Sequence, residues 1–413
     1  MATPSGSTVI HAGNLLADPA QGPQQRCSIQ IKDGKIVAVS SGFVEPPPGA
    51  HLIDLKDKFV LPGLIDCHVH LTGQFGPGYR LRTVEDSDVK IGLDGAYYAN
   101  LTVRAGFTTV RDVGAMGSSP DTIFALRAAI AERKVPGPRI LCVGTILSPT
   151  GGHGQTYGYR QDVCACVQSA SGTCDGVDDC RRAVRRQVSF GADAIKFVAT
   201  GGVLSNIKAG IDQQFTDDEI RTIIETAHGL GRRVAAHAHG AGGINAALRN
   251  GVDSIEHGSF LDDESIRLFL DRNAYHVPTV IAGMTALEMV KSMPDMSKAQ
   301  ADKAIMVGGK IKEALSRSYA AGVKIAFGTD MGVGPHGQNA REFALMVECG
   351  VKPADAIKAA TVTASQLLDI QDEVGTIAAG KTADIIAVDG NPLEDVRTLE
   401  RVKFVMSRGS VLV

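Results

Sequence analysis

The middle of the chain alternates short apolar runs rich in β-branched residues with longer stretches whose apolar residues recur every three or four positions. This alternation predicts parallel strands connected by crossover helices. One helix is well indicated, because Thr216 and Glu219 have capping-box spacing and apolar residues then follow on one face. The eight predicted strands are VLPGLIDCHVH, FTTVRDVG, RILCVGTIL, DAIKFVAT, RVAAHAHG, DSIEHG, HVPTVI and KIAFGTD. Eight such units predict an α/β fold of the closed (β/α)8 TIM-like barrel type.

Both ends of the chain have a different pattern. Residues 8–58 consist of short strand-like runs separated by turn residues, with Asp33 and Gly34 as a hairpin turn. Residues 375–413 repeat this style, with Gly, Asn and Pro between the runs. We therefore predict a small β-sandwich domain formed by residues 1–58 together with 373–413, and a barrel over residues 59–372.

The charge of the chain is nearly balanced, with 42 lysines and arginines against 45 aspartates and glutamates. Such a chain has no long-range field that would attract nucleic acid or an anionic membrane. No apolar run approaches the ~20 residues needed to cross a bilayer. We therefore expect a small-molecule substrate as the partner, and no binding to nucleic acid or membranes.

Half of the eight cysteines lie in one Gly-, Ser- and Asp-rich segment: Cys164, Cys166, Cys174 and Cys180. Two disulfides here would place the protein in an oxidising compartment, the periplasm or the cell exterior. Reduced thiols in a cytoplasmic protein are the alternative, and a zinc site is a third option with unusual spacing. The first residues lack the basic and apolar regions of a signal peptide. Export would therefore require a signal that this sequence does not contain.

Polar residues gather where the predicted strands end. His68 and His70 close the first strand, and residues two apart share one face of a strand. Later strands end in His237 and His239 (the fifth), His257 (the sixth) and Asp330 (the eighth). Residues at these ends point into the mouth of a barrel. Imidazoles with carboxylates are ligands that zinc and similar ions prefer. Each residue alone could be an ordinary core or rim group, but together they predict a metal site.

Lys196 lies in the otherwise apolar fourth strand, where burying an unpaired ammonium would be unfavourable. A salt bridge would solve this problem. Carboxylation by CO2 is the alternative, because it converts the amine into a carboxylate that can bridge two metal ions. The predicted ligands around Lys196 favour carboxylation.

The order His-x-His, Lys, His, His, Asp on successive strands resembles the amidohydrolase superfamily, as do VLPGLIDCHVHL and GTIAAGKTADIIAVDGNP. The segments SPTGGHG, KFVATGGVLS, AAHAHG and SIEHGS resemble the imidazolonepropionase-related metallopeptidases, which include prolidase-like dipeptidases, carboxypeptidases and ochratoxinase. The similarity spans essentially the whole chain. It implies a symmetric homo-oligomer with two divalent metal ions, favouring Zn²⁺, although manganese, cobalt or iron suit the same ligands. One ion would be held by His68, His70 and Asp330, the other by His237 and His257, with N6-carboxylated Lys196 as the bridge.

The same resemblance implies an amide hydrolase. The two ions would lower the pKa of a bound water and polarise the scissile carbonyl. Asp330 would act as general base and then acid, and substrate-facing His239 would stabilise the oxyanion. We expect cleavage of N-acyl amino acids or dipeptides with release of the C-terminal residue, with ochratoxin-type phenylalanine amides in the substrate range.

A cyclic-amide hydrolase similar to dihydroorotase, hydantoinase or imidazolonepropionase, or a deaminase, is the alternative. Imidazolonepropionase itself uses one metal without the bridging lysine, so Lys196 counts against that activity. Motifs of other hydrolases and of NTPases, namely HExxH, GxSxG and the P-loop, are absent from the sequence. A non-catalytic barrel is a further alternative, and the intact ligand set argues against it.

The loop SPTGGHGQTYGYR after the third strand offers His153, Tyr157 and Arg160 as contacts for a substrate carboxylate. Arginine is favoured for its bidentate geometry. The same segment could be a Gly-rich connection with surface polar residues, because loops both carry function and simply connect.

Overall fold

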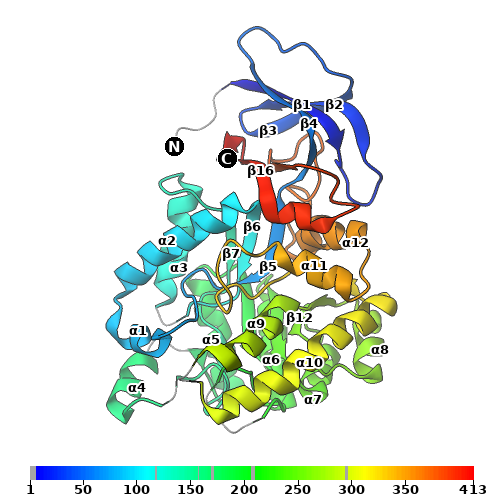
Figure 1. Cartoon of the computed structure of the whole chain (residues 1–413). Helices are drawn as coiled ribbons and strands as arrows, with labels where there is room; N and C mark the ends of the chain where they lie inside the picture. The colour runs from blue at the N-terminus through cyan, green and yellow to red at the C-terminus, as the bar shows by residue number, and fades with distance from the viewer. Residues whose placement is uncertain (1–5, 117–118, 157, 169–171, 206–209, 294–295) are drawn as a thin grey trace.

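The computed structural model describes the chain of 413 residues except for residues 1–5, 117–118, 157, 169–171, 206–209 and 294–295 (Figure 1). A small sheet built from the two chain ends lies at one end of the molecule, and the larger helical and parallel-stranded body lies beside it (Figure 1).

The small sheet has seven strands in the order β17-β16-β15-β4-β1-β2-β3. Its N-terminal strands are β1 (Ser7–Leu15), β2 (Gln24–Lys32), β3 (Lys35–Ser41) and β4 (His51–Pro62), and its C-terminal strands are β15 (Ile385–Val388), β16 (Val402–Ser407) and β17 (Ser410–Val411). The two sets meet where β15 pairs antiparallel with β4, so that Ile386 faces Leu61. Apolar residues of both sets, among them Ile10, Ile29 and Ile385, are buried in one core.

The larger body contains parallel strands in barrel order. They are β5 (Leu64–Val69), β6 (Phe107–Asp112), β7 (Arg139–Cys142), β8 (Leu147–Ser148), β9 (Gly172–Thr173), β10 (Ala194–Val198), β11 (Arg233–Ala238), β12 (Ser254–His257), β13 (Tyr275–Val277) and β14 (Lys324–Ile325). Backbone bonds close the ring: Cys67 N–H donates to Phe327 O at 2.8 Å on one side, and Asp193 N–H donates to Cys142 O at 2.8 Å on the other.

Helices surround these strands (Figure 1). They are α1 (Tyr79–Glu85), α2 (Asp88–Arg104), α3 (Pro120–Ala131), α4 (Gln161–Gln168), α5 (Gly176–Ser189), α6 (Asp217–Gly229), α7 (Ala241–Arg249), α8 (Asp263–Arg272), α9 (Val280–Ser292), α10 (Lys298–Ala320), α11 (Arg341–Glu348), α12 (Pro353–Lys358) and α13 (Ala364–Leu367), with a π-turn at Ala359–Thr363 and a 3-10 turn at Val396–Arg401. The capping box predicted at Thr216 and Glu219 is present at the start of α6.

The predicted fold class, a (β/α)8 barrel with a small β-domain from both termini, is confirmed. Two predicted strands differ at their ends. Val60–Pro62 belong to β4 of the small sheet, and the barrel strand β5 starts only after Gly63. The run HVPTVI ends as a strand at Val277, because α9 begins at Val280. The domain bounds 1–58, 59–372 and 373–413 remain a prediction.

The barrel and the small sheet share a joint around Asp384. Arg139 of β7 donates to Asp384 Oδ2 at 3.0 Å, and Arg408 N–H donates to Asp384 Oδ1 at 2.6 Å. The largest apolar core continues across this joint, since it contains Phe59 of the small sheet together with Phe107 of the barrel.

The cysteine-rich segment carries thiols in this structure. Cys174 and Cys180 are buried with their Sγ atoms 3.7 Å apart, whereas Cys164 and Cys166 lie on α4. The predicted disulfides and the oxidising compartment therefore remain predictions. Within the described residues, no helix combines the length and apolar character needed to span a bilayer.

Candidate metal centre and active site

His68, His70 and Asp330 form one group at the ends of β5 and β14. Their potential ligand atoms lie within 4.8 Å of one another. Asp330 Oδ1 is 3.4 Å from His68 Nε2 and 3.2 Å from His70 Nε2. Burial alone would raise the pKa of Asp330, but the two imidazoles hold it well below its usual range. The carboxylate is therefore ionised and presents negative charge to this group.

The tautomers of both imidazoles follow from their second hydrogen bonds. His68 Nδ1 lies 2.7 Å from Glu256 Oε2, and His70 Nδ1 lies 2.8 Å from the carbonyl oxygen of Gly114. An ionised carboxylate and a carbonyl can only accept, so both Nδ1 atoms carry the proton. Without a proton on Nε2, the form that binds a metal ion, each ring would direct a lone pair toward Asp330. Three acceptors that converge in this way suit a divalent cation.

Glu256 is fixed between His68 and Arg111. The Arg111 guanidinium, which is fully buried, donates to Glu256 Oε1 at 2.8 Å and to the carbonyl of Cys67 at 2.6 Å. Burial alone would raise the pKa of Glu256, but Arg111 and Lys196 hold it well below its usual range. Carboxylates placed behind metal-binding imidazoles orient the ring and increase its basicity.

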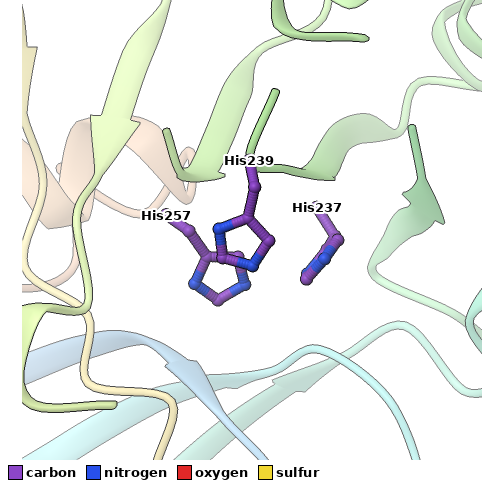
Figure 2. A group of neighbouring side chains, drawn as sticks. All are labelled: His237, His239 and His257. Atoms are coloured by element: carbon purple, nitrogen blue, oxygen red, sulfur yellow. The ribbon is translucent and has the colours of Figure 1, made fainter. Parts of the chain in front are cut away.

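His237, His239 and His257 form a second group (Figure 2). They come from β11, the turn after it, and β12. Their ring centroids lie 4.6 to 4.9 Å apart, and the three side chains are close neighbours in Figure 2. Burial lowers the pKa of all three imidazoles, that of His239 to about 3. They are therefore neutral at physiological pH, the form that binds metal ions.

Two hydroxyl groups fix rings of this second group. His257 Nδ1 lies 2.7 Å from Thr279 Oγ1, and His239 Nδ1 lies 2.8 Å from Ser259 Oγ. A hydroxyl can donate or accept, so it permits either tautomer. His239 can therefore present Nε2 as a metal ligand or as an N–H donor to substrate. The two groups are adjacent, since the rings of His68 and His257 are 5.1 Å apart.

Lys196 of β10 lies beside both groups and lines the same cavity. It is 2% exposed, and its Nζ has no hydrogen-bond partner among the residues that the structure describes. Burial lowers its pKa to about 8, which increases the fraction of neutral amine. His237 Nε2 is likewise buried without a partner. Buried polar atoms without partners are unfavourable and call for an explanation. Together with the convergent acceptors, these atoms fit metal ions and a modified lysine.

Backbone strain accompanies the site. His257 (φ 72°), Asp330 (φ 59°) and Thr279 (φ 49°) adopt the left-handed region that non-glycine residues seldom occupy. Such conformations cost of order 1–3 kcal/mol each and persist where the surroundings fix them. Here the strained residues are two candidate metal ligands, His257 and Asp330, and Thr279, whose hydroxyl contacts His257.

The two groups open into a cavity of about 360 Å³, the size of a small-molecule site. His153 lines it, with its ring 4.5 Å from that of His237. The structure does not bring Arg160 there: its side chain is 80% exposed and pairs with Asp162 at 2.8 Å. Tyr157 lies outside the described residues. The arginine that lines the cavity is Arg80 of α1.

Comparison with known proteins agrees with this site. The model of the amidohydrolase family matches residues 59–412. The chain belongs to the amidohydrolase family. It is therefore a hydrolase of amide bonds, in a family whose members generally use metal ions. The predicted superfamily membership is confirmed.

Relatives of this amidohydrolase are similar over nearly its whole length. The ochratoxinase of Aspergillus niger is 30% identical, over 96% of this chain and 84% of its own. A solved Xaa-Pro dipeptidase with bound methionine in the active site is 38% identical with a TM-score of 0.90, over 98% and 99% of the two chains. A prolidase complexed with N-methylphosphonate-L-proline is 32% identical with a TM-score of 0.89, over the same shares.

Three polar residues of this amidohydrolase site are missing from the sequence-based prediction. Glu256 had a visible signal, because it is a charged residue directly before His257 in a short predicted barrel strand. Arg111 had a similar signal within β6. Arg80 had none, because its place at the cavity depends on how α1 packs against the loop containing Gly158, whose carbonyl it contacts at 2.9 Å.

Proposed function

We propose that this chain is a binuclear metal-dependent amidohydrolase that cleaves N-acyl amino acids or dipeptides and releases the C-terminal residue. The observation that carries this proposal is the position of Lys196. Its Nζ is buried, without a hydrogen-bond partner in the described part of the chain, beside two groups of imidazole and carboxylate side chains. The names of the dipeptidase, the prolidase and the ochratoxinase support an amide next to a carboxylate-bearing residue. Ochratoxin-type phenylalanine amides belong to the proposed substrate range.

The proposed ligand sets follow the two groups. His68, His70 and Asp330 would hold one divalent ion, His237 and His257 the other, and N6-carboxylated Lys196 would bridge them. Zn²⁺ is the preferred ion because most of the ligands are imidazoles. When bound, the ions supply a water of lowered pKa and polarise the scissile carbonyl.

Asp330 would move the proton of the reaction. The carboxylate is ionised, so an Oδ atom has a lone pair that can accept a proton from water. It would then deliver that proton to the departing amine. Because His68 and His70 fix its position, Asp330 can act in both steps without moving.

His239 would stabilise the oxyanion of the tetrahedral intermediate. In this role the Ser259 hydroxyl donates to Nδ1, which leaves Nε2–H directed at the substrate. The alternative tautomer would make His239 a metal ligand within the group of three histidines. The proposed role therefore predicts that His239→Asn retains metal while losing activity.

We propose that Arg80 and His153, rather than Arg160, bind the substrate carboxylate. Arg80 lies at the cavity, where its guanidinium stacks over the Tyr159 ring at 5.2 Å and donates to Gly158 O. These contacts hold the planar group in place, and such a group can bind a carboxylate with two parallel hydrogen bonds. His153 is kept neutral, because burial lowers its pKa to about 4, so it would contribute a hydrogen bond and no charge.

The test combines metal content with hydrolysis. We expect about two zinc equivalents per chain when the protein is purified with zinc and bicarbonate, and amide hydrolysis that a chelator abolishes. Lys196→Ala should lose metal and activity together, and ¹³C-labelled bicarbonate should give a carbamate NMR signal only in the wild type. Partly exposed Lys312, paired with Glu348 at 2.8 Å, provides the control Lys312→Ala.

Full metal content and activity in Lys196→Ala would contradict the bridged site. Hydrolysis of dihydroorotate or hydantoin without hydrolysis of any N-acyl amino acid or dipeptide would contradict the proposed substrate class.

A further inference from the structure

One side of the cavity is an apolar wall formed by helices α9 and α10 and by the loop after β10. The residues of this apolar wall that line the cavity are Val203, Leu204, Ala282, Ala286, Val307 and Ile311. Five of them are buried: Val203, Ala282, Ala286, Val307 and Ile311. The wall is thus an extension of the packed core, and the side chains that face the cavity are aliphatic.

Small side chains on α9 leave room in front of this wall. Ala282 and Ala286 lie one helical turn apart and both face the cavity. Gly283 lets α9 approach α10 closely, because a Cβ atom there would lie 3.0 Å from Ile311 Cγ2. The two helices are therefore fixed against each other, and the space in front of the alanines is open to a ligand.

The loop part of the wall is held rigidly by polar groups of α10. Lys303 Nζ donates to the carbonyl oxygens of Gly202 and Ser205, each at 2.7 Å. Gln300 Nε2 donates to the carbonyl oxygen of Leu204 at 2.5 Å. Lys303 is 6% exposed, so these bonds lie in the protein interior. A wall held in this way is preorganised, which lowers the entropy lost on binding.

The charges of the cavity lining argue against a charged substrate side chain at the apolar wall. Among the described residues that line the cavity, Asp330 is the only carboxylate, and His68 and His70 already contact it. A basic group of the substrate would find no counter-ion at the apolar wall. Burying a charge there without a partner is strongly unfavourable. The same argument applies to an acidic side chain, because Arg80 is not part of the apolar wall and is already assigned to the carboxylate of the substrate.

We propose that the apolar wall is the subsite for a large uncharged aliphatic or aromatic group adjacent to the scissile amide, and that Ala282 and Ala286 set its depth. This inference rests on the proposed amide hydrolysis. The group belongs either to the acyl part of the substrate or to the released amino acid. The chemistry of the wall is the same in both cases, and two substrate series distinguish them.

The first series varies the released residue in N-acetyl-alanine, -leucine, -phenylalanine, -glutamate and -lysine. The second varies the acyl group in acetyl-, hexanoyl- and benzoyl-alanine. In at least one series, kcat/KM should rise roughly tenfold or more from the small to the large apolar member, the range typical of added apolar contacts. In the first series the charged members should be the poorest substrates. Calorimetric titration with free phenylalanine, glutamate and lysine gives the same ranking without turnover.

Ala282→Leu tests the wall directly. Because the added methyl groups would occupy the subsite, kcat/KM for the large apolar substrate should fall roughly tenfold or more while that for N-acetyl-alanine changes little. A merely structural role would lower both by the same factor. Ala286→Leu provides a second variant if Ala282→Leu does not fold. The matched control is Ala131→Leu, at an exposed position at the end of α3 and away from the cavity.

The possible failures are distinguishable. If no amide is hydrolysed, the proposed function fails, whereas the binding titration still decides the nature of the subsite. If amides are hydrolysed but lysine or glutamate is preferred, or if Ala282→Leu and Ala286→Leu affect small and large substrates equally, the inference about the wall is overturned.

Discussion

Glu256 illustrates how a residue outside the ligand set determines what a ligand can do. It lies 188 positions from His68 in the sequence, and its Oε2 is 2.7 Å from His68 Nδ1. Arg111 neutralises the other side of the same carboxylate at 2.8 Å. Arg111, Glu256 and His68 thus form a buried series of contacts that leads from the barrel interior to the candidate metal site. Through these contacts, the strand that ends in His257 also orients His68.

We predict that Glu256→Gln weakens metal binding by roughly 10- to 100-fold, the usual effect of removing such a partner. The amide can still accept from His68, but it no longer increases the basicity of the ring and it leaves Arg111 without its counter-ion. Zinc affinity, measured by competition with a chromophoric chelator, reports this directly. The control is Glu225→Gln on the exposed side of α6. An unchanged affinity in Glu256→Gln would contradict the orienting role.

At the scale of single residues, the sequence shows which side chains could bind a metal ion or a substrate, but it does not show which of them come into contact in the fold. The histidines were recognisable because each ends a predicted strand, and the structure brings them together in two adjacent groups. Their roles as ligands remain a proposal. Arg160 and Arg80 show what the sequence does not reveal, because both are arginines near predicted loops and only one of them lies at the cavity. Which of them lies at the cavity depends on tertiary packing that no local pattern encodes.

At the scale of elements, the start of α9 explains why one predicted strand was too long. The run HVPTVI is apolar and β-branched, which favours a strand. In the structure, Glu342 of α11 accepts from the backbone N–H groups of Val280 and Ile281 at 2.8 and 2.7 Å. The two carboxyl oxygens thereby satisfy unpaired donors of the helix N-terminus. A side chain more than sixty residues away thus decides where the helix begins.

Glu342 makes stability depend on pH. Although the two N–H groups lower its pKa, burial raises it to about 8, above the usual value of 4.5. Between these values the folded chain binds more protons than the unfolded chain, so this contribution to stability is present at low pH and is lost as the pH rises through about 8. We predict that Glu342→Gln reduces the fall in the unfolding temperature between pH 6 and pH 9, measured by calorimetry.

The control for this prediction is Glu348→Gln, at the exposed end of the same helix. It should reproduce the pH dependence of the wild type. Identical pH profiles for Glu342→Gln and the wild type would contradict a protonated Glu342 in the folded state.

At the scale of the whole molecule, the alternation of strands and helices was sufficient to predict both the barrel and the composite small domain. Turn residues near both ends signalled similar β-ribbons, and pairing of β4 with β15 confirms that they form one sheet. The joint between sheet and barrel was not predictable. Arg139 and Asp384 are 245 residues apart, and each is unremarkable in its own segment.

We predict that Arg139→Leu lowers the free energy of unfolding by about 2 kcal/mol, because it leaves buried Asp384 without its charged partner. Denaturant unfolding should still show one transition, shifted to a lower midpoint, since the core continues across the joint. Arg160→Leu is the control, because its exposed pair with Asp162 should contribute less than about 1 kcal/mol. Two separate transitions in Arg139→Leu would show that the joint does not couple the two parts.

The pairing of β4 with β15 also affects how the chain can fold during synthesis. A ribosome delivers β1 to β4 before the barrel, whereas β15 (Ile385–Val388) and its neighbours emerge only after the barrel. Until then the free edge of β4 is available to strands of other chains, a recognised route to aggregation. The barrel that follows β4 directly is synthesised entirely within this interval. Completion of the small sheet therefore has to follow synthesis of the barrel, and a nascent chain stalled before β15 would depend on chaperones to protect that edge.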